Sequence, residues 1–209
     1  HELIDAAVNS GANAVKFQTF IAEQLASTVA PKADYQKNLT NSEETQLEML
    51  RSFELSQKDH AELMSHCKEV GIIFLSTPFD ETAADMLDDL GVSAFKIGSG
   101  DMTNLPLLRH VTKKGKPLLL STGMSTLDEV IISVKAIEES QAVPLALLHC
   151  VSCYPAKPEE CNLSVMHTLR EKFNVAVGFS DHTLGSSISL AAVALGANVH
   201  GLDVGGPPP

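Results

Sequence analysis

The sequence predicts an α/β fold, and more specifically a TIM-type (β/α)8 barrel that is incomplete because its first strand is missing. Three observations support this prediction. Short apolar runs alternate with helical stretches, mostly at intervals of roughly 20–30 residues, which is typical of parallel strands joined by crossover helices. A glycine stands between many of the helices and the run that follows, and nearly every run ends in polar, reactive side chains.

The apolar runs predict seven strands. Each run is short and rich in aliphatic side chains, as strands buried on both faces are. The predicted strands are Ala14–Phe17, Ile72–Ser76, Ala94–Ile97, Pro117–Ser121, Leu145–Cys150, Val175–Phe179 and Asn198–Val199. Five of them follow a glycine that permits a left-handed cap at the preceding helix end, namely Gly11, Gly71, Gly91, Gly115 and Gly196.

The helical stretches carry their own start signals. Ser56 to Asp59 opens a helix that runs through Val70, and Thr126 to Glu129 forms a capping box before Val130–Glu139. Apolar residues then recur at helical spacing. Residues 184–195 are small and apolar, which is typical of a helix packed against a sheet.

An open doubly wound sheet competes with the barrel. The polar ends of the predicted strands favour the barrel, because all its strand carboxyl ends meet at one mouth, where active sites lie. An open sheet brings only a few of these ends together at its switch point. The chain starts within an apparent helix, so we expect the first barrel strand to lie upstream.

Composition excludes several classes of protein. The 209 residues carry a net charge of −11, so a nucleic-acid backbone is not expected as a partner, and no apolar run approaches the roughly 18 residues that span a bilayer. Four cysteines are too few for a disulfide scaffold. The Cys150–Cys153 spacing allows a redox or metal site, but we favour buried and near-surface thiols in a strand of a cytoplasmic protein.

One long connection, residues 21–42, shows little periodicity. Long loops in compact domains are often lids or interaction segments. A solvated excursion is the alternative, and the sequence leaves both open.

Two lysines and a set of hydroxyls are expected to form the functional site. Lys16 and Lys96 each lie within an apolar strand, where an unpartnered ammonium is costly to bury. One explanation for these lysines is that each pairs with a carboxylate. The other is that both bind an anionic ligand, or that one of them acts as a Schiff-base amine. Hydroxyls that reach the same mouth favour an anionic ligand: they belong to Thr77, Ser99, Ser121, Ser152 and Ser180. Gly98 and Gly100, and separately Gly123, allow close backbone approach to it.

The histidines differ in their expected roles. His182 follows a strand end beside Asp181, which favours a metal ligand or an acid–base group. His149 lies within an apolar strand and is expected in the core. The histidines on helices are expected at the surface: His60, His66, His110 and His167.

Six blocks of this sequence resemble the sialic acid synthase family, which includes N-acetylneuraminate, legionaminate-type and pseudaminate-type synthases. The blocks are Lys16–Phe20, Phe74–Asp80, Phe95–Asp101, Leu120–Met124, Leu148–Pro155 and Gly178–Thr183. They occur in the family's order between His1 and about Val199. They are specific for the family and separate its members poorly.

The resemblance implies a barrel that condenses phosphoenolpyruvate with an N-acetylated amino sugar, using Mn²⁺ or Mg²⁺, in a homodimer. It implies that phosphoenolpyruvate is held by Lys16, Thr77, Lys96, Ser99, Ser121 and Ser180, with Ser152 where some members carry Asn. Tyr154 lines the same pocket, Gln18 and Asp101 face the sugar, and His182 is a metal ligand by the same resemblance. Lys16, Lys96 and His182 are then the expected catalytic residues.

The carboxyl end departs from the family pattern. A second metal-ligating His is expected after Asn198–Val199, and Asp203 stands at its position, with Gly201 where the family has Glu. We expect residues 1–204 to form a partial barrel domain, followed by a Gly/Pro tail over 205–209. The family's C-terminal antifreeze-like domain is expected to be absent from this chain, which is truncated at both ends.

Two other functions stay open. A Schiff-base aldolase of the same barrel fold would use Lys16 or Lys96 as its amine. The second alternative is that the chain is a non-catalytic fragment. A barrel without its first strand cannot close, and it exposes strand edges. Such a chain is expected to be marginally stable, to aggregate or pair with another chain, and to have little activity.

Overall fold

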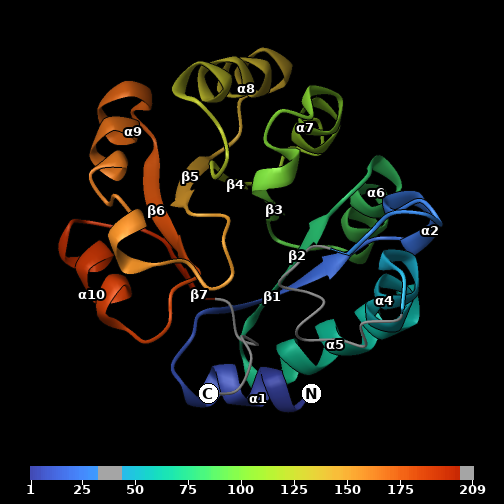
Figure 1. The fold of residues 1–209 in the computed structure, drawn as a ribbon. Helices are drawn as coiled ribbons and strands as arrows, with labels where there is room; N and C mark the ends of the chain where they lie inside the picture. The colour runs from blue at the N-terminus through green and yellow to red at the C-terminus, as the bar shows by residue number, and fades with distance from the viewer. Residues whose placement is uncertain (33–43, 203–209) are drawn as a thin grey trace. The chain divides into compact units, whose positions relative to one another are not determined.

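The computed structural model describes residues 1–32 and 44–202, in which helices and parallel strands alternate along the chain (Figure 1). Residue contacts divide the chain into two compact units, His1–Ser93 and Ala94–Pro209. Most of the predicted long connection, Asp203 and the Gly/Pro tail lie outside the described residues. The predicted domain division stays a prediction.

The first unit contains a pair of parallel strands. Strands β1 (Ala14–Thr19) and β2 (Ile73–Pro78) pair in register from Ala14 opposite Ile73 to Thr19 opposite Pro78. The helices of this unit are α1 (Glu2–Asn9), α2 (Ala22–Leu25), α4 (Gln46–Phe53), α5 (Gln57–Val70) and α6 (Glu81–Leu90). Helix α5 leads directly into β2, so it forms part of the crossover between the two parallel strands.

The ends of α5 form as the sequence predicts. Ser56 accepts a hydrogen bond from the backbone N–H of Asp59, and the Asp59 carboxylate accepts one from the Ser56 N–H, which completes a capping box. The helix ends at Gly71, whose φ of 78° is the left-handed conformation that glycine adopts without a Cβ clash.

His60 lies in the core of the first unit, so the prediction that it is a surface residue is wrong. Its side chain is fully buried. Nδ1 donates to the Ser56 carbonyl oxygen at 2.9 Å, and Nε2 therefore accepts from the Thr19 hydroxyl at 2.8 Å. Thr19 in turn lies 2.7 Å from the Ser76 hydroxyl oxygen. This network joins α5 to the helix-facing sides of β1 and β2.

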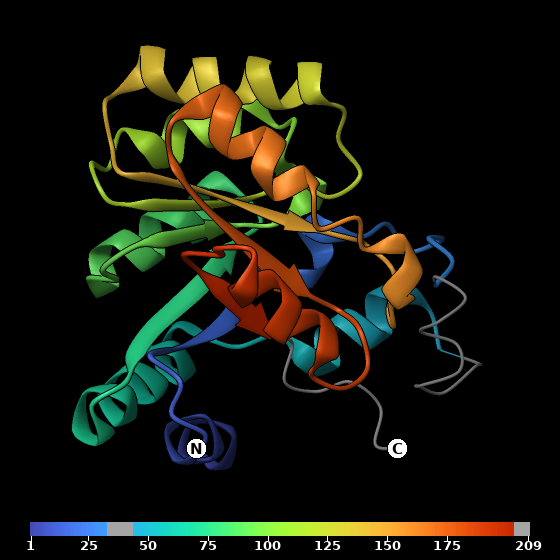
Figure 2. The ribbon, with the colours of Figure 1, turned by 90° about the vertical axis from the view of Figure 1, so that its left-hand side faces the viewer.

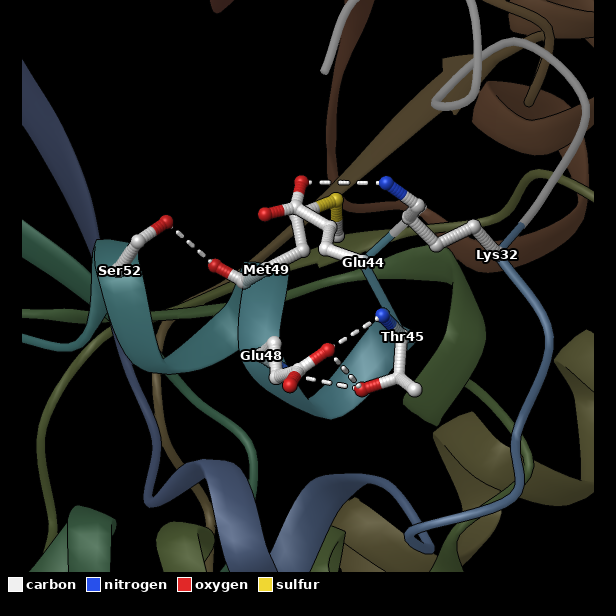
Figure 3. Close-up of polar contacts among 6 residues, drawn as sticks. All are labelled: Lys32, Glu44, Thr45, Glu48, Met49 and Ser52. Atoms are coloured by element: carbon white, nitrogen blue, oxygen red, sulfur yellow. Dashed lines mark hydrogen bonds and ion pairs between the residues drawn. The ribbon is translucent and has the colours of Figure 1, made fainter. Parts of the chain in front are cut away.

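An ion pair and a capping box flank the start of α4 (Figure 3). Lys32 Nζ lies 3.1 Å from Glu44 Oε1, and the lysine side chain is only 2% exposed. Thr45 and Glu48 form the capping box of α4, and the Ser52 hydroxyl donates to the Met49 carbonyl at 2.7 Å. This largely buried ion pair thus joins Lys32 to Glu44 at the start of the segment that leads into α4.

The second unit contains a five-stranded parallel sheet in the order β3-β4-β5-β6-β7. Its strands are β3 (Phe95–Ile97), β4 (Leu118–Ser121), β5 (Leu145–Cys150), β6 (Ala176–Asp181) and β7 (His200–Leu202). The helices between them are α7 (Leu105–Thr112), α8 (Leu127–Ser140), α9 (Val165–Phe173) and α10 (Ser187–Ala194), with short 3-10 turns at Ser99–Asp101 and Pro158–Glu160.

The two faces of this sheet carry different side chains. Alternation and register place Ile97, Leu120, Leu147, Val177 and Phe179 on one face, where all five are buried. Helices α9 and α10 pack on the strands on this side (Figure 2). The helix-covered face therefore holds the hydrophobic core of the second unit.

His149 lies in this core, as predicted. Its Nε2 donates to the Cys161 carbonyl oxygen at 2.7 Å. Burial lowers the pKa of the imidazole, although the hydrogen bond to Cys161 opposes that effect in part. His149 is therefore a neutral structural histidine.

The described residues contain the seven predicted strands, and their parallel pairing confirms the α/β prediction. Boundaries differ: β1 runs on to Thr19, β6 runs on to Asp181, and β7 begins at His200 instead of Asn198. Strand β5 ends at Cys150, so placing Cys153 in the same strand was wrong. All four cysteines are free thiols. No helix of the described residues is both long and apolar enough to cross a bilayer.

Gly178 on β6 is expected to be essential for the pairing of β6 with β7. A Cβ there would lie 2.0 Å from the Val199 carbonyl oxygen, which accepts the backbone N–H of Phe179. We expect Gly178→Ala to lower the free energy of unfolding by about 3 kcal/mol or more, because a backbone atom must move. Urea denaturation measures this.

Gly201→Ala is the matched control for that substitution. A Cβ at Gly201 would meet only the Ser180 hydroxyl oxygen, at 3.8 Å, an ordinary contact. Equal losses of stability in the two variants would contradict the steric explanation.

Candidate active site

The carboxyl ends of the strands carry most of the predicted site residues. Eight belong to the second unit: Lys96, Ser99, Asp101, Ser121, Ser152, Tyr154, Ser180 and His182. Lys16, Gln18 and Thr77 belong to the first unit and are described separately.

Strand register gathers several of these side chains on one face of the five-stranded sheet. Lys96 is opposite Leu119 on β4, and Ser121 two residues further along shares its face. Ser121 is opposite Leu148, and Cys150 beyond it is opposite Ser180. Lys96, Ser121, Cys150 and Ser180 thus lie on the face opposite the helices.

Lys96 is a buried cation bonded within this face. Its residue is only 6% exposed. Nζ donates to the Ser121 hydroxyl oxygen at 2.6 Å and to the Ile97 carbonyl oxygen at 2.8 Å. The buried ammonium brings a positive charge to this face of the sheet, and a positive charge favours an anion nearby. The prediction of a buried lysine is confirmed for Lys96.

Ser99, Cys150 and Ser152 converge on Gly123, just beyond the end of β4. The Gly123 N–H donates to the Ser99 hydroxyl oxygen at 3.0 Å. The Ser99 oxygen also lies 3.0 Å from the Cys150 sulfur. This contact of Cys150, expected only as a buried or near-surface thiol, was not predicted from the sequence. Its position on the same strand face as Ser121 was the signal that could have indicated it.

His182 is fixed by the loop that follows β5. Its Nδ1 lies 2.6 Å from the Val151 carbonyl oxygen, which can only accept, so Nδ1 carries the proton. Nε2 is therefore an acceptor, and the Tyr154 hydroxyl donates to it at 3.3 Å. The two rings stack with centroids 4.3 Å apart. The Ala156 N–H donates to the His182 carbonyl oxygen at 2.8 Å, which holds the backbone as well.

This orientation suits a metal ligand. Metal-binding histidines characteristically donate their other ring N–H to a carbonyl or carboxylate, which fixes the tautomer. Within residues 1–32 and 44–202, no group of three His, Cys, Asp or Glu side chains is placed to hold a metal ion. The chemistry of His182 therefore fits one ligand, and Asp203, expected at the second ligand position, lies outside those ranges.

Asp181 faces the helices and not the site. Burial opposes its ionisation, but hydrogen bonds from the Ser189 hydroxyl and the Thr183 N–H outweigh that effect and lower the pKa of the carboxyl. The Asp181 carboxylate thus ties the end of β6 to α10. It supports the turn that carries His182.

Asp101 lies in the 3-10 turn after β3. Burial raises the pKa of its carboxyl, and a hydrogen bond donated by Asn104 Nδ2 at 3.2 Å offsets part of that rise. Burial thus disfavours the charged form of this carboxyl, a pattern that functional residues often show.

The first unit places its three predicted residues on one face of β1 and β2. Gln18 is opposite Thr77, and Lys16 is opposite Leu75. Thr77 is buried, whereas Lys16 and Gln18 are exposed. The prediction that Lys16 is a buried ammonium is therefore wrong, because the pleat turns it away from the face that packs against α5. Lys16 is also mid-strand, since β1 continues to Thr19.

The chain matches known proteins over nearly its whole length. The model of the NeuB family matches residues 3–200. The N,N'-diacetyllegionaminic acid synthase of Campylobacter jejuni is 48% identical over 200 residues, which cover 95% of this chain and 60% of the relative. The synthase of the same name from Legionella pneumophila is 46% identical over 202 residues, or 95% of this chain and 57% of the relative.

A solved structure agrees with these matches. It is N-acetylneuraminic acid (sialic acid) synthetase from Leptospira borgpetersenii in complex with citrate, with a TM-score of 0.85 and 32% identity. The match covers 96% of this chain and 65% of that one. This chain thus spans about three fifths of the length of the proteins that it matches.

Asp101 is expected to make stability depend on pH. A pKa raised in the folded state means that the folded protein holds this proton more tightly than the unfolded chain does, so stability falls as pH rises through and above the usual carboxyl range near ~4. We expect Asp101→Asn to be more stable than wild type at pH 7. The difference should shrink as pH is lowered toward 3.5, measured by urea denaturation across this range.

Glu138→Gln is the control for this prediction, since it makes the same chemical change at an exposed position of the second unit. It should leave the pH dependence unchanged. The interpretation fails if Asp101→Asn follows the same pH profile as the control.

Proposed function

Because the chain belongs to the NeuB family, we propose that its protein condenses phosphoenolpyruvate with an N-acetylated amino sugar. The product is a nine-carbon sugar acid of the sialic acid type, and phosphate is released. The observation that carries this proposal is the buried Lys96 ammonium bonded to the Ser121 hydroxyl at the strand ends. The names of the relatives, which are legionaminic and sialic acid synthases, support it.

We propose further that the strands of both units belong to one (β/α)8 barrel. Parallel pairing within each unit and the alternation of strands and helices support this architecture. In such a barrel Lys16, Gln18 and Thr77 would join the mouth formed by the second unit. The homodimer stays a prediction.

Phosphoenolpyruvate would be held by cations and hydroxyls. Its phosphate and carboxylate carry two to three negative charges, which the ammonium groups of Lys16 and Lys96 would offset. Hydroxyl donors from Thr77, Ser99, Ser121, Ser152 and Ser180 would complete the hydrogen bonds of the oxygen atoms. An anion that takes up the buried Lys96 charge costs little further desolvation of that lysine, because it is already out of water.

The amino sugar would lie beside this anion. Gln18 offers an amide, and Asp101 a carboxylate that accepts sugar hydroxyls. Tyr154 lies against His182 and would line the same pocket. His182 Nε2 would take part in holding Mn²⁺ or Mg²⁺. When bound there, the metal ion would polarise the aldehyde oxygen of the sugar.

In the proposed reaction, a carbon–carbon bond forms between the methylene of phosphoenolpyruvate and the aldehyde carbon. The aldehyde oxygen gains a proton and becomes a hydroxyl. Water then adds to the carbon that bears the phosphate, and the carbon–oxygen bond to phosphate breaks. Lys96 and the hydroxyls act by holding the enol ester in place and by offsetting its charge.

We expect the reaction to take place in the cytoplasm. The four cysteines are free thiols, which is in keeping with a reducing compartment.

Phosphate release tests the proposal. The full-length protein is incubated with phosphoenolpyruvate, Mn²⁺ and either N-acetylmannosamine or its di-N-acetylated relatives, and inorganic phosphate is measured. We expect release that depends on the sugar. No release with any of these sugars would contradict the proposed function. Covalent trapping of pyruvate by borohydride would favour the aldolase instead.

Lys96→Met tests directly whether the buried Lys96 ammonium is needed to bind phosphoenolpyruvate. It keeps the length of the side chain and removes the charge, so we expect kcat/KM for phosphoenolpyruvate to fall at least about 100-fold. Lys135→Met makes the same change on α8, where the side chain is 70% exposed, and should leave kcat/KM unchanged. A Lys96→Met enzyme with wild-type kcat/KM would refute the assigned role.

A further inference from the structure

Gly123 is a crowded glycine near the proposed site. A Cβ built on it would lie 2.6 Å from the Ser152 hydroxyl oxygen and 2.8 Å from both the Cys150 sulfur and the Ser99 hydroxyl oxygen. These three atoms come from the segments that follow β3 and from β5 and its following loop. Three polar side chains thus contact the Cα side of one buried glycine.

The need for glycine here is steric and not conformational. The glycines that end helices have positive φ, for example 78° at Gly71 and 86° at Gly91, whereas Gly123 does not. Any residue could adopt its backbone angles. What excludes a side chain is the space taken up by the Ser99, Cys150 and Ser152 side chains.

The Gly123 backbone also orients Ser99. Its N–H donates to the Ser99 hydroxyl oxygen at 3.0 Å, and the Cys150 thiol lies 3.0 Å from the same oxygen. When Ser99 accepts from both, its own O–H proton is left for another acceptor. A hydroxyl that accepts hydrogen bonds donates more strongly, so Ser99 is suited to a phosphate or carboxylate oxygen.

We propose that Gly123 is a positioning residue that gathers Ser99, Cys150 and Ser152 into one anion-binding surface of the second unit. Its missing side chain leaves the space, and its N–H sets the direction of the Ser99 hydroxyl. Cys150 is part of this surface as a spacer and thiol donor. The inference rests on the proposed function for its ligand, phosphoenolpyruvate, and on the geometry alone for the gathering of the three side chains.

Gly123→Ala tests the proposal by kinetics. We expect KM for phosphoenolpyruvate to rise at least tenfold, with a much smaller change in KM for the sugar. Gly201→Ala is the control, because a Cβ at this glycine of the second unit meets only the Ser180 hydroxyl oxygen, at an ordinary contact distance of 3.8 Å. Equal kinetic effects of the two substitutions would overturn the proposal.

Thiol alkylation tests the geometry without relying on activity. Cys150 is only 4% exposed, and the added methyl group should push its neighbours apart and expose its sulfur atom. Cys153 is exposed and serves as the reference for full reactivity. We expect iodoacetamide to label Cys150 at least five times faster in Gly123→Ala than in wild type or Gly201→Ala, measured by peptide mass spectrometry. Cys67 and Cys161 report on the fold, because burial raises the pKa of both thiols and slows their labelling.

A second substitution should suppress the first. Cys150→Ala removes the sulfur atom and gives Ser99 and Ser152 room to move away from the new methyl group. We expect Gly123→Ala/Cys150→Ala to recover at least threefold in KM for phosphoenolpyruvate relative to Gly123→Ala, with Cys150→Ala alone measured beside it. Should Gly123→Ala fail to fold, the double variant should fold.

The outcomes separate the two proposals. If wild type releases no phosphate, the proposed function fails, and Cys150 labelling still decides the role of Gly123. If Gly123→Ala changes neither KM nor labelling, or if the double variant shows no recovery, Gly123 has no positioning role.

Discussion

The buried ammonium of Lys96 is the constraint on which the second unit's site depends. A charge at this depth is tolerated because the Ile97 carbonyl and the Ser121 hydroxyl accept from it. These acceptors come from β3 itself and from the neighbouring strand, so the β3–β4 register must be correct before the charge is satisfied. The pairing of the strands and the polarity of the site are therefore set by the same contact. The site residues lie at the strand carboxyl ends because the middle of each strand is packed in the core, whereas its carboxyl end is available to a ligand.

Alternation along the strands explains how chemistry and packing are separated. On β6, Ser180 faces the side that carries Lys96, while Asp181 faces the helices and is held by Ser189. On β5, Cys150 and His149 divide in the same way. Polar residues one position apart thus have different roles, one at the candidate site and one in packing against the helices. The pKa directions agree with this division, because His149 is kept neutral by burial, whereas Asp181 is kept ionised by its donors.

Much of the fold could be predicted from the sequence, because it depends on local signals. Strand cores are short apolar runs, and the helix ends at Ser56, Gly71 and Thr126 use side-chain caps or left-handed glycine that are visible within a few residues. The failures involve partners distant in sequence. His60 can be buried because Thr19, 41 residues away, donates a hydrogen bond to its Nε2. Its spacing from Met64 and Cys67, at i+4 and i+7 on one buried helix face, was the available signal. Lys16 was misjudged because an apolar strand does not reveal which face is covered.

The strand-end residues of the candidate site could be named from the sequence, and their roles stay predictions, whereas their geometry could not be predicted. Strand-end motifs gave the lysine, the serines and His182, and the resemblance gave them roles. The sequence could not give the orientation of His182, which results from one carbonyl at Val151 and one N–H at Ala156, both on a loop that the β5–β6 connection brings back. The same holds for Gly123, whose importance comes from the three side chains packed where its own side chain would be. In both cases backbone atoms decide how the side chains act. A family motif therefore identifies the reacting groups, whereas the turns between its strands determine where those groups point.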